Sequence, residues 1–189
     1  MAIRVDVYTS GGMASGYLGR PGPLRDALEA SGGLPLDRTA WLALDAPAAE
    51  TAGSVTIPAD DILVAVDDDD PATPVHASWH RISLDAGPYL VEGDLPTMPG
   101  FDPGRALTRP SGEFVMLRDV TLSIPDRPDI GTASGDHALV NRYAVERIRA
   151  ELMLGFFFPG AVVEAVEGGV GIRPQAPDPN ATPAGPVAG

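Results

Sequence analysis

The side chains best suited to metal chemistry are two histidines, His76 and His80. On a strand, residues four apart share a face, because four residues are two full side-chain periods. On a helix they lie on adjacent turns. Either geometry brings two imidazoles to one ion, and the aspartates at 67–70 and Asp85 could add oxygen ligands. The alternative is that Trp79 anchors a strand after a linker and both histidines lie at the surface. His76 and His80 are therefore candidate metal ligands.

The other polar residues carry no reaction signature. Ser134, Asp136 and His137 are the residue types of a catalytic triad, but neighbours in sequence rarely converge on one point. Glu92 and Asp94 would point the same way from a strand, as an acid–base pair does, or simply line a solvated face. Phosphate-binding glycine motifs and nucleophile elbows are missing. We predict no catalytic residue and no cofactor, although an enzyme of unfamiliar type stays open.

Charge and composition narrow the partners. The 189-residue chain has 26 acidic and 13 basic residues, all of the latter arginine, and a formal charge of −13. This charge repels phosphate, which disfavours nucleic acids and anionic membranes as partners. The absence of cysteine excludes disulfides, thiolate zinc sites and iron–sulfur clusters. No segment reads as a signal peptide or a membrane span, so we expect a cytoplasmic protein, and the composition is typical of a GC-rich bacterial genome.

The elements that would position these residues form an internal repeat. A shift of 77 residues brings Val5 and Val7 onto Ile82 and Leu84, and the same shift brings Gly16 onto Gly93. Further along the chain the shift grows to 79, 81 and 83, always within segments rich in Gly, Pro or Asp, where loops accept insertions. The alternative is one irregular β domain whose strands resemble each other because all strands alternate.

Each repeat predicts a small β unit. An alternating strand leads to a second strand that ends in Gly-x-Leu, then to a helical turn at 24–28 or 104–107. Two hairpins follow, and the first of them turns at Asp37-Arg38 in one repeat and at Arg118-Asp119 in the other. We predict a mainly β protein with two tandem bent-sheet or barrel-like units that pack face to face over a shared core. The expected bounds are 1–70 and 71–150, followed by an apolar extension at 151–172 and a disordered tail at 173–189.

One stretch of the second unit is ambiguous. Residues 136–154 alternate as a strand does, but Val145, Ile148 and Leu152 also fit helical spacing. We favour a strand to about Arg147, because the first unit has β-branched residues at the matching positions, with a short helix after it as an alternative.

An apolar segment lies beyond both repeats. It contains three of the five phenylalanines, and its large apolar residues are Leu152, Leu154, Phe156, Phe157 and Phe158. The segment either caps the core or forms an exposed patch that a partner covers. These five residues are the candidate partner-binding site.

The repeat pattern resembles β-rich repeat domains of unknown function from bacteria. Four features carry the resemblance: Gly93, Arg105 with Leu107, the strand 114–120 that runs into Asp-Val, and 139–142 with its Val-Asn-Arg end. The first unit keeps Gly16 and the helical turn but has Pro58-Ala59 in place of Asn-Arg. The resemblance implies a β fold and no activity.

These observations favour a non-catalytic scaffold or accessory subunit that binds another protein or assembles with itself. The alternative is a small-ligand or metal-binding module with a site between the two units or at His76 and His80.

Overall fold

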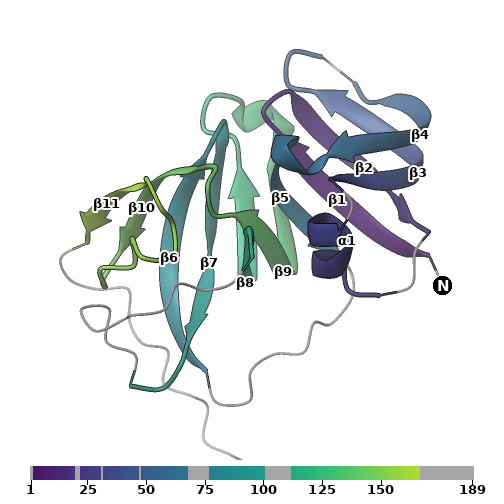
Figure 1. The fold of residues 1–189 in the computed structure, drawn as a ribbon. Helices are drawn as coiled ribbons and strands as arrows, with labels where there is room; N and C mark the ends of the chain where they lie inside the picture. The colour runs from purple at the N-terminus through teal and green to yellow at the C-terminus, as the bar shows by residue number, and fades with distance from the viewer. Residues whose placement is uncertain are drawn as a thin grey trace, which may run out of the picture.

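The computed structural model describes residues 2–19, 22–30, 32–46, 48–67, 77–100 and 112–166. Its described strands form one mixed, unclosed sheet of eleven strands in the order β11-β10-β6-β7-β8-β9-β5-β1-β2-β3-β4 (Figure 1). The prediction of a mainly β protein is confirmed. No described helix is long and apolar enough to cross a membrane. The proposed linker after Asp67, the second helical turn and the tail lie outside the described residues.

The N-terminal half comprises five strands and a short helix. Their bounds are β1 Ile3–Thr9, β2 Gly12–Leu18, α1 Leu24–Ala30, β3 Gly33–Ala43, β4 Glu50–Pro58, the 3-10 turn η1 Ala59–Asp61, and β5 Ile62–Asp67. The first four strands follow one another across the sheet, while β5 returns to pair with the outer side of β1. The helix α1 lies beside β3, as the apolar pattern of its leucines predicts (Figure 1).

The C-terminal half has the same strand order. Its elements are β6 Ser78–Ala86, β7 Tyr89–Thr97, β8 Phe114–Ser123, the 3-10 turn η3 Pro128–Ile130, β9 Thr132–Asn141 and β10 Val145–Ala150, and β11 Val162–Ala165 follows outside the repeat. Here β10 returns to the outer side of β6, as β5 does to β1. In the ambiguous stretch 136–154 the favoured strand is present: β9 runs to Asn141 and β10 runs three residues beyond Arg147, to Ala150. Residues 151–154, where a short helix was the alternative, are neither strand nor helix.

The two halves also share their registers, irregularities included. In the β1–β5 ladder Tyr8 pairs with Val64, and in the β6–β10 ladder Asp85 pairs with Arg147. Both ladders shift by one residue directly next to these pairs. Tyr17 pairs with Asp37 as Asp94 pairs with Arg118, again with matching shifts. These pairs agree with the offsets of 77, 81 and 83 found in the sequence. We call two residues equivalent when these offsets relate them.

The predicted hairpin turn at 37–38 and its counterpart at 118–119 are wrong. β3 and β8 run straight through these positions as single long strands. Arg38 and Asp119 both have a positive φ of 51°, and one such residue in a strand makes a bulge without reversing the chain. Gly16 lies opposite the first bulge, where an added Cβ would be 2.9 Å from Cβ of Leu36, so the Gly-x-Leu motif provides space for the bulge.

The predicted second hairpin of each unit is also wrong in its pairing. The strands are present, but β4 does not pair with β5, nor β9 with β10. Both β5 and β10 instead close onto the first strand of their own half, and β5 also pairs with β9 of the other half through Val64–Val140 and Ala65–Leu139. Alternation alone predicts a strand and does not specify its neighbour.

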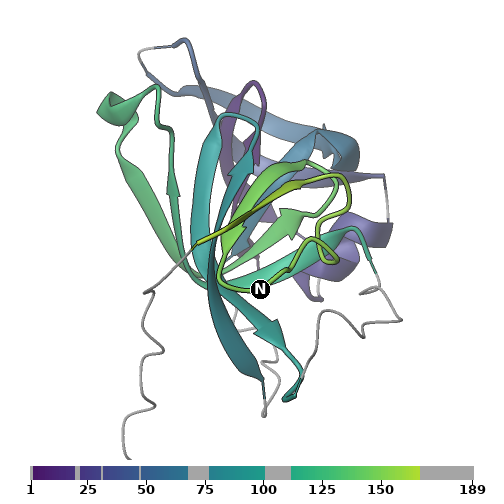
Figure 2. The same ribbon diagram turned by 90° about the vertical axis from the view of Figure 1, so that its left-hand side faces the viewer.

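The two halves have separate cores on opposite faces of the sheet. On β5, Val64 belongs to the C-terminal core and its neighbour Ala65 to the N-terminal core. Successive side chains of a strand point to opposite faces, so the two cores lie on opposite sides of β5. Figure 2 views the molecule from the side of the C-terminal half, whose strands lie in front of the N-terminal ones. The predicted face-to-face packing over one shared core is therefore wrong, because the units join edge to edge.

Side chains nevertheless cross between the halves. Tyr8 and Val64 of the N-terminal half are buried in the C-terminal core. Phe114 of the C-terminal half, 1% exposed, is buried in the N-terminal core, and Leu139 packs against that core. We call this β5–β9 contact, with its crossing side chains, the junction.

Candidate functional site

The predicted metal site is only partly described, because His76 lies outside the described residues. The His80 ring is half-buried, and its Nε2 lies 2.8 Å from Oγ1 of Thr97. Burial lowers the pKa of His80, an effect that the charge of Glu151 opposes. Among the described residues, no three His, Asp or Glu side chains are grouped closely enough to hold a metal ion. His80 is thus placed as a hydrogen-bonded strand residue.

The other polar candidates lie on strand surfaces. Ser134, Asp136 and His137 are all on β9, where Ser134 and Asp136 are not buried. Asp94 lies 3.5 Å from Arg81 and 3.9 Å from Arg118. The Arg118 guanidinium also stacks 3.9 Å above the Trp79 ring, a cation–π contact that no sequence pattern predicted. These contacts describe a polar sheet face and not a reaction centre.

The apolar segment beyond β10 covers one end of the C-terminal core. Leu154 and Phe158 are fully buried in this core, and Leu152 and Phe157 pack against it while partly exposed. Phe156 makes an edge-on contact with Phe157, with the ring centroids 5.7 Å apart. Leu154 and Phe158 thus have no surface to offer a partner in this structure.

Arg142, which is 2% exposed, ties this segment to the end of β9. Its guanidinium NH2 group donates to the backbone oxygen of Phe156 at 3.2 Å. A buried charge needs such hydrogen bonds to offset its lost hydration. The arginine that ends the Val-Asn-Arg motif therefore helps to hold the phenylalanine segment in place.

A groove lies between the two halves at the β1–β2 turn. One cavity of about 210 Å³ is lined by residues of both halves, including Tyr8, Met13, Tyr89 and Ile130. It adjoins an open hollow of about 500 Å³ beside Arg127, which donates to the backbone oxygen of Leu44.

Two tyrosines form the floor of this groove. The rings of Tyr8 and Tyr89 meet edge to face at 5.4 Å, and the Tyr89 hydroxyl lies 2.9 Å from O of Thr9 and 3.0 Å from O of Gly12. Burial, reinforced by the charge of Asp6, raises the pKa of Tyr8 to about 12. Burial also raises the pKa of Tyr89. Both phenols are therefore neutral at physiological pH and act as structural groups.

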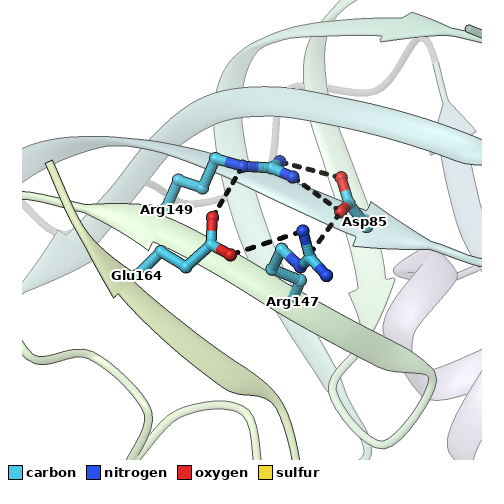
Figure 3. Close-up of polar contacts among 4 residues, drawn as sticks. All are labelled: Asp85, Arg147, Arg149 and Glu164. Atoms are coloured by element: carbon cyan, nitrogen blue, oxygen red, sulfur yellow. Dashed lines mark hydrogen bonds and ion pairs between the residues drawn. The ribbon is translucent and has the colours of Figure 1, made fainter.

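The outer side of β10 is closed by a network of four charged side chains (Figure 3). Arg149 makes two hydrogen bonds of 2.9 Å to the Asp85 carboxylate and one of 3.2 Å to Glu164 on β11. Arg147 lies 3.8 Å from Asp85 and 3.3 Å from Glu164. The hydrogen bonds to Asp85 raise the pKa of Arg149 further. The network fastens β11 to the sheet.

This network occupies the positions that form the junction in the other half. Asp85 is equivalent to Tyr8, Arg147 to Val64, and Arg149 to Val66. Tyr8 and Val64 are buried at the junction, and Val66 packs beside Gly135 of β9. Three uncharged junction residues are thus replaced by three charged ones at the end of the sheet. Terminal repeats of repetitive proteins commonly carry polar residues in this way.

The other end of the sheet is the outer edge of β4, with which no described strand pairs. Its equivalent, β9, receives β5 at Leu139 and Val140. The equivalent residues on β4 are Thr56, which is exposed, and Ile57, which is buried. Pro35 lies opposite Thr56 and has no N–H. In an antiparallel ladder, directly opposed residues either exchange two hydrogen bonds or exchange none. Because Pro35 has no N–H to give, Pro35 and Thr56 are a pair without hydrogen bonds, and the N–H and C=O of Thr56 face away from β3.

The outer edge of β4 is acidic and short. A bulge at Gly53, with φ of 68°, and Pro58 delimit the segment 54–57 that is free to pair. Four exposed acids lie on β4, on the neighbouring β3 or in the turn η1 that follows, and Ser54 donates to the one on β3 at 2.7 Å. They are Asp37, Glu50, Asp60 and Asp61. Such an edge favours a basic extended segment, because opposite charges across strands stabilise pairing. We call residues 54–57 the β4 edge.

Comparisons with protein-family models, with curated proteins and with solved structures found no match. The assignment of function therefore depends on the geometry of this chain.

Proposed function

We propose that this protein is a duplicated, non-catalytic scaffold that binds another protein chain by adding an extended segment to the β4 edge. The matching registers of the two halves support the duplication. The observation that carries the binding function is the difference between equivalent strands: β9 has a neighbouring strand on both sides, whereas β4 has a described neighbour only on the β3 side. An unpaired edge offers main-chain hydrogen bonds to an added strand.

The partner segment should be basic and extended. Its main chain would pair with Thr56 and its neighbours, and its arginines or lysines would meet the acids that surround the β4 edge. We expect a short ladder, like the two residue pairs by which β5 meets β9. Affinity would then come from side-chain contacts as well as from the main chain, as at the junction.

A photo-crosslinking amino acid at position 56 tests the proposal in the native host. The matched control carries the same amino acid at Thr121, which is on the other half of the sheet and pairs with Glu92 and Ser134. We expect one specific adduct from position 56 and none from position 121. An equal pattern from both positions, or no adduct although a stoichiometric partner co-purifies, would place the partner elsewhere.

Paired substitutions make the test specific for the main chain. Thr56→Pro removes the outward N–H, while Thr56→Ala shortens the side chain and keeps it. Loss of the adduct partner in the proline variant and its retention in the alanine variant would identify strand addition. Equal loss in both variants would instead indicate a side-chain contact.

A second candidate function is the binding of a small apolar ligand in the groove between the halves. The cavity beside Tyr8, Tyr89 and Ile130 favours it, because residues of both halves line it. A ligand that binds only the folded chain raises its melting temperature by mass action. Leu42, which lines both hollows, offers the control: Leu42→Arg should abolish any such shift. A metabolite panel that leaves the wild-type melting temperature unchanged would exclude this function.

A further inference from the structure

We propose that β11 is a displaceable cap, and that the β10 strand beneath it docks onto the β4 edge of a second copy of this chain. Copies would then join head to tail. The inference rests on the proposed function in one respect, since it requires the β4 edge to accept a strand. It adds the identity of one such strand and the element that controls its exposure.

The junction provides the template for this contact. There, the fifth strand of one half (β5) pairs with the fourth strand of the other (β9). The equivalent strands at the two ends of the sheet are β10 and β4. Transferring the junction register to them places Arg147 opposite Ile57 and Ile148 opposite Thr56. The ladder shifts of β5 and β10 within their own halves match, so the backbone of β10 is already shaped for this pairing.

β11 lies on β10 at the positions where β9 lies on β5 at the junction. At the junction, Leu139 lies opposite Ala65 and packs against the N-terminal core. At the end of the sheet, Val163 of β11 lies opposite Ile148, the equivalent of Ala65, and packs against the C-terminal core. The cap therefore covers the same two positions, 147 and 148, that the template uses for contact between units.

The positive charge of Arg149 favours acidic β4 as the strand that replaces β11. Val66 lies beside Gly135 at the junction, so its equivalent Arg149 would lie beside Gly53 of the second copy, which has the matching place on β4. Glu50 follows on the same strand beyond the bulge and is exposed. At Arg149 an apolar contact of the junction is thus exchanged for a pairing of opposite charges, and the second copy supplies the carboxylate that Glu164 supplies in the closed chain.

The cap is held weakly enough to be displaced. β11 has four residues and pairs in parallel, the less stable arrangement, and Val162 is 58% exposed. The arginine contacts of Glu164 are partly exposed, and such ion pairs usually contribute little. The resulting contact is heterologous, with a free β4 at one end and a free β10 at the other, so assembly continues without closing.

Glu164→Arg in the full-length chain opens the cap, because it places a third positive charge beside Arg147 and Arg149. The matched control is Glu146→Arg, which makes the same change of charge at an exposed residue of β10. Light scattering should show a mass that rises with concentration to several chains for Glu164→Arg and stays at one chain for the control. Thr56→Leu, which restores the leucine of the junction, should shift this assembly to lower concentration.

A mixing experiment defines the two surfaces. The double variant Glu164→Arg/Thr56→Pro exposes β10 and blocks the β4 edge. In the wild-type chain, β11 covers β10 and the β4 edge is open. Each alone should be a monomer, and the mixture should form a complex of one chain of each, which has no further free pair of edges. A large assembly of the double variant alone would show that another surface is responsible.

A folded Glu164→Arg variant that stays monomeric at every concentration overturns the inference. Circular dichroism establishes folding, and Glu164→Gln serves as the milder second variant, with assembly expected at higher concentration. Crosslinking at position 56 to a different protein would then leave the proposed function intact. If the Glu164→Arg variant stayed monomeric and crosslinking at position 56 also gave no adduct, the β4 edge would not be a binding surface.

Discussion

The junction and the two ends of the sheet are formed by equivalent strands that carry different side chains. At the junction, Tyr8, Val64 and Phe114 cross from one half into the core of the other. At the ends, their equivalents are Asp85, Arg147 and Gly33, which are charged or lack a side chain. Equivalent strands therefore form a contact between the halves in one place and a capped or open edge in the others. The comparison teaches that side chains, and not backbone hydrogen bonds, determine which edges of this repeat are joined.

The largest effect should come from Phe114→Ala. We expect a loss of about 3–5 kcal/mol in the free energy of unfolding, because a buried aromatic ring leaves a cavity. The residue belongs to the C-terminal half but fills the N-terminal core, so the N-terminal half should lose more stability. Each half has one tryptophan: Trp41 packs against the N-terminal core and Trp79 lies on β6. In a Trp79→Phe background the fluorescence of Trp41 reports unfolding of the N-terminal half, and in a Trp41→Phe background that of Trp79 reports the C-terminal half. A larger shift of the Trp79 signal would contradict the crossed packing.

The next effect is a loss of stability in alkali, of the order of 2–3 kcal/mol between pH 10 and 12. The ordinary tyrosine pKa is 10.0, and burial raises that of Tyr8 to about 12. Below pH 10 both the folded and unfolded chains keep the phenolic proton. Above it the unfolded chain loses the proton first, so unfolding becomes more favourable until the folded pKa is passed. The chain has no lysine, so side-chain amines do not obscure this range.

Urea denaturation at a series of pH values measures this effect. Tyr8→Phe and Tyr89→Phe should each flatten the decline above pH 10, since each removes one ionising group from the groove between the halves. Tyr17→Phe is the control, because Tyr17 lies on an exposed strand face away from this groove. An unchanged slope in both groove variants would show that these tyrosines do not govern the alkaline transition.

The sequence predicted the elements and the repeat better than it predicted their neighbours. Alternation of Val5 and Val7, and offsets that grow in steps from 77 to 83, located the strands and their equivalent positions. The same alternation could not show that β5 returns to β1, because strand pairing is set by contacts between distant residues. The bulges at Arg38 and Asp119 were mistaken for turns, since polar residues between apolar runs are typical of both.

The candidate site was less accessible to sequence reasoning. The offsets contained one usable signal: equivalents of apolar residues at 64 and 66 are arginines at 147 and 149. Compared across the two halves, that substitution indicates that β10 has a different neighbour from β5. The sequence left open whether Leu154 and Phe158 cap the core or face a partner, and both side chains are buried in the C-terminal core. His76 lies outside the described residues, so its role stays a prediction.

A smaller effect should follow from Tyr89→Phe at neutral pH. The hydroxyl of this C-terminal residue bonds to two backbone oxygens of the β1–β2 turn, Thr9 and Gly12. Its removal should lower the free energy of unfolding by about 1–2 kcal/mol, because the buried turn loses the one hydroxyl proton that these two oxygens share. Tyr8→Phe, which removes a neighbouring hydroxyl, should cost less. A loss as large as that of Phe114→Ala would mean that the groove, and not the crossed core packing, dominates the contact between halves.

The smallest effect should be that of Glu164→Gln on a dilute monomer. Its two arginine contacts are partly exposed, so we expect a loss of less than about 1 kcal/mol, and less in high salt. Chemical denaturation at low and high ionic strength measures it. If the loss were several kcal/mol and independent of salt, the network would be a core element of the C-terminal half and not the fastening of a cap.

The crossed packing of Phe114 has a consequence for synthesis on the ribosome. The N-terminal half emerges first, yet its core includes a side chain that is made only after β7, and Leu139 comes later still. Until then the nascent first half has an incomplete core, and the edge of β5 that later pairs with β9 is open; both features attract other nascent chains or chaperones. The core of the N-terminal half is therefore completed only after Phe114 of the C-terminal half has been synthesised, so the two halves cannot finish folding one after the other.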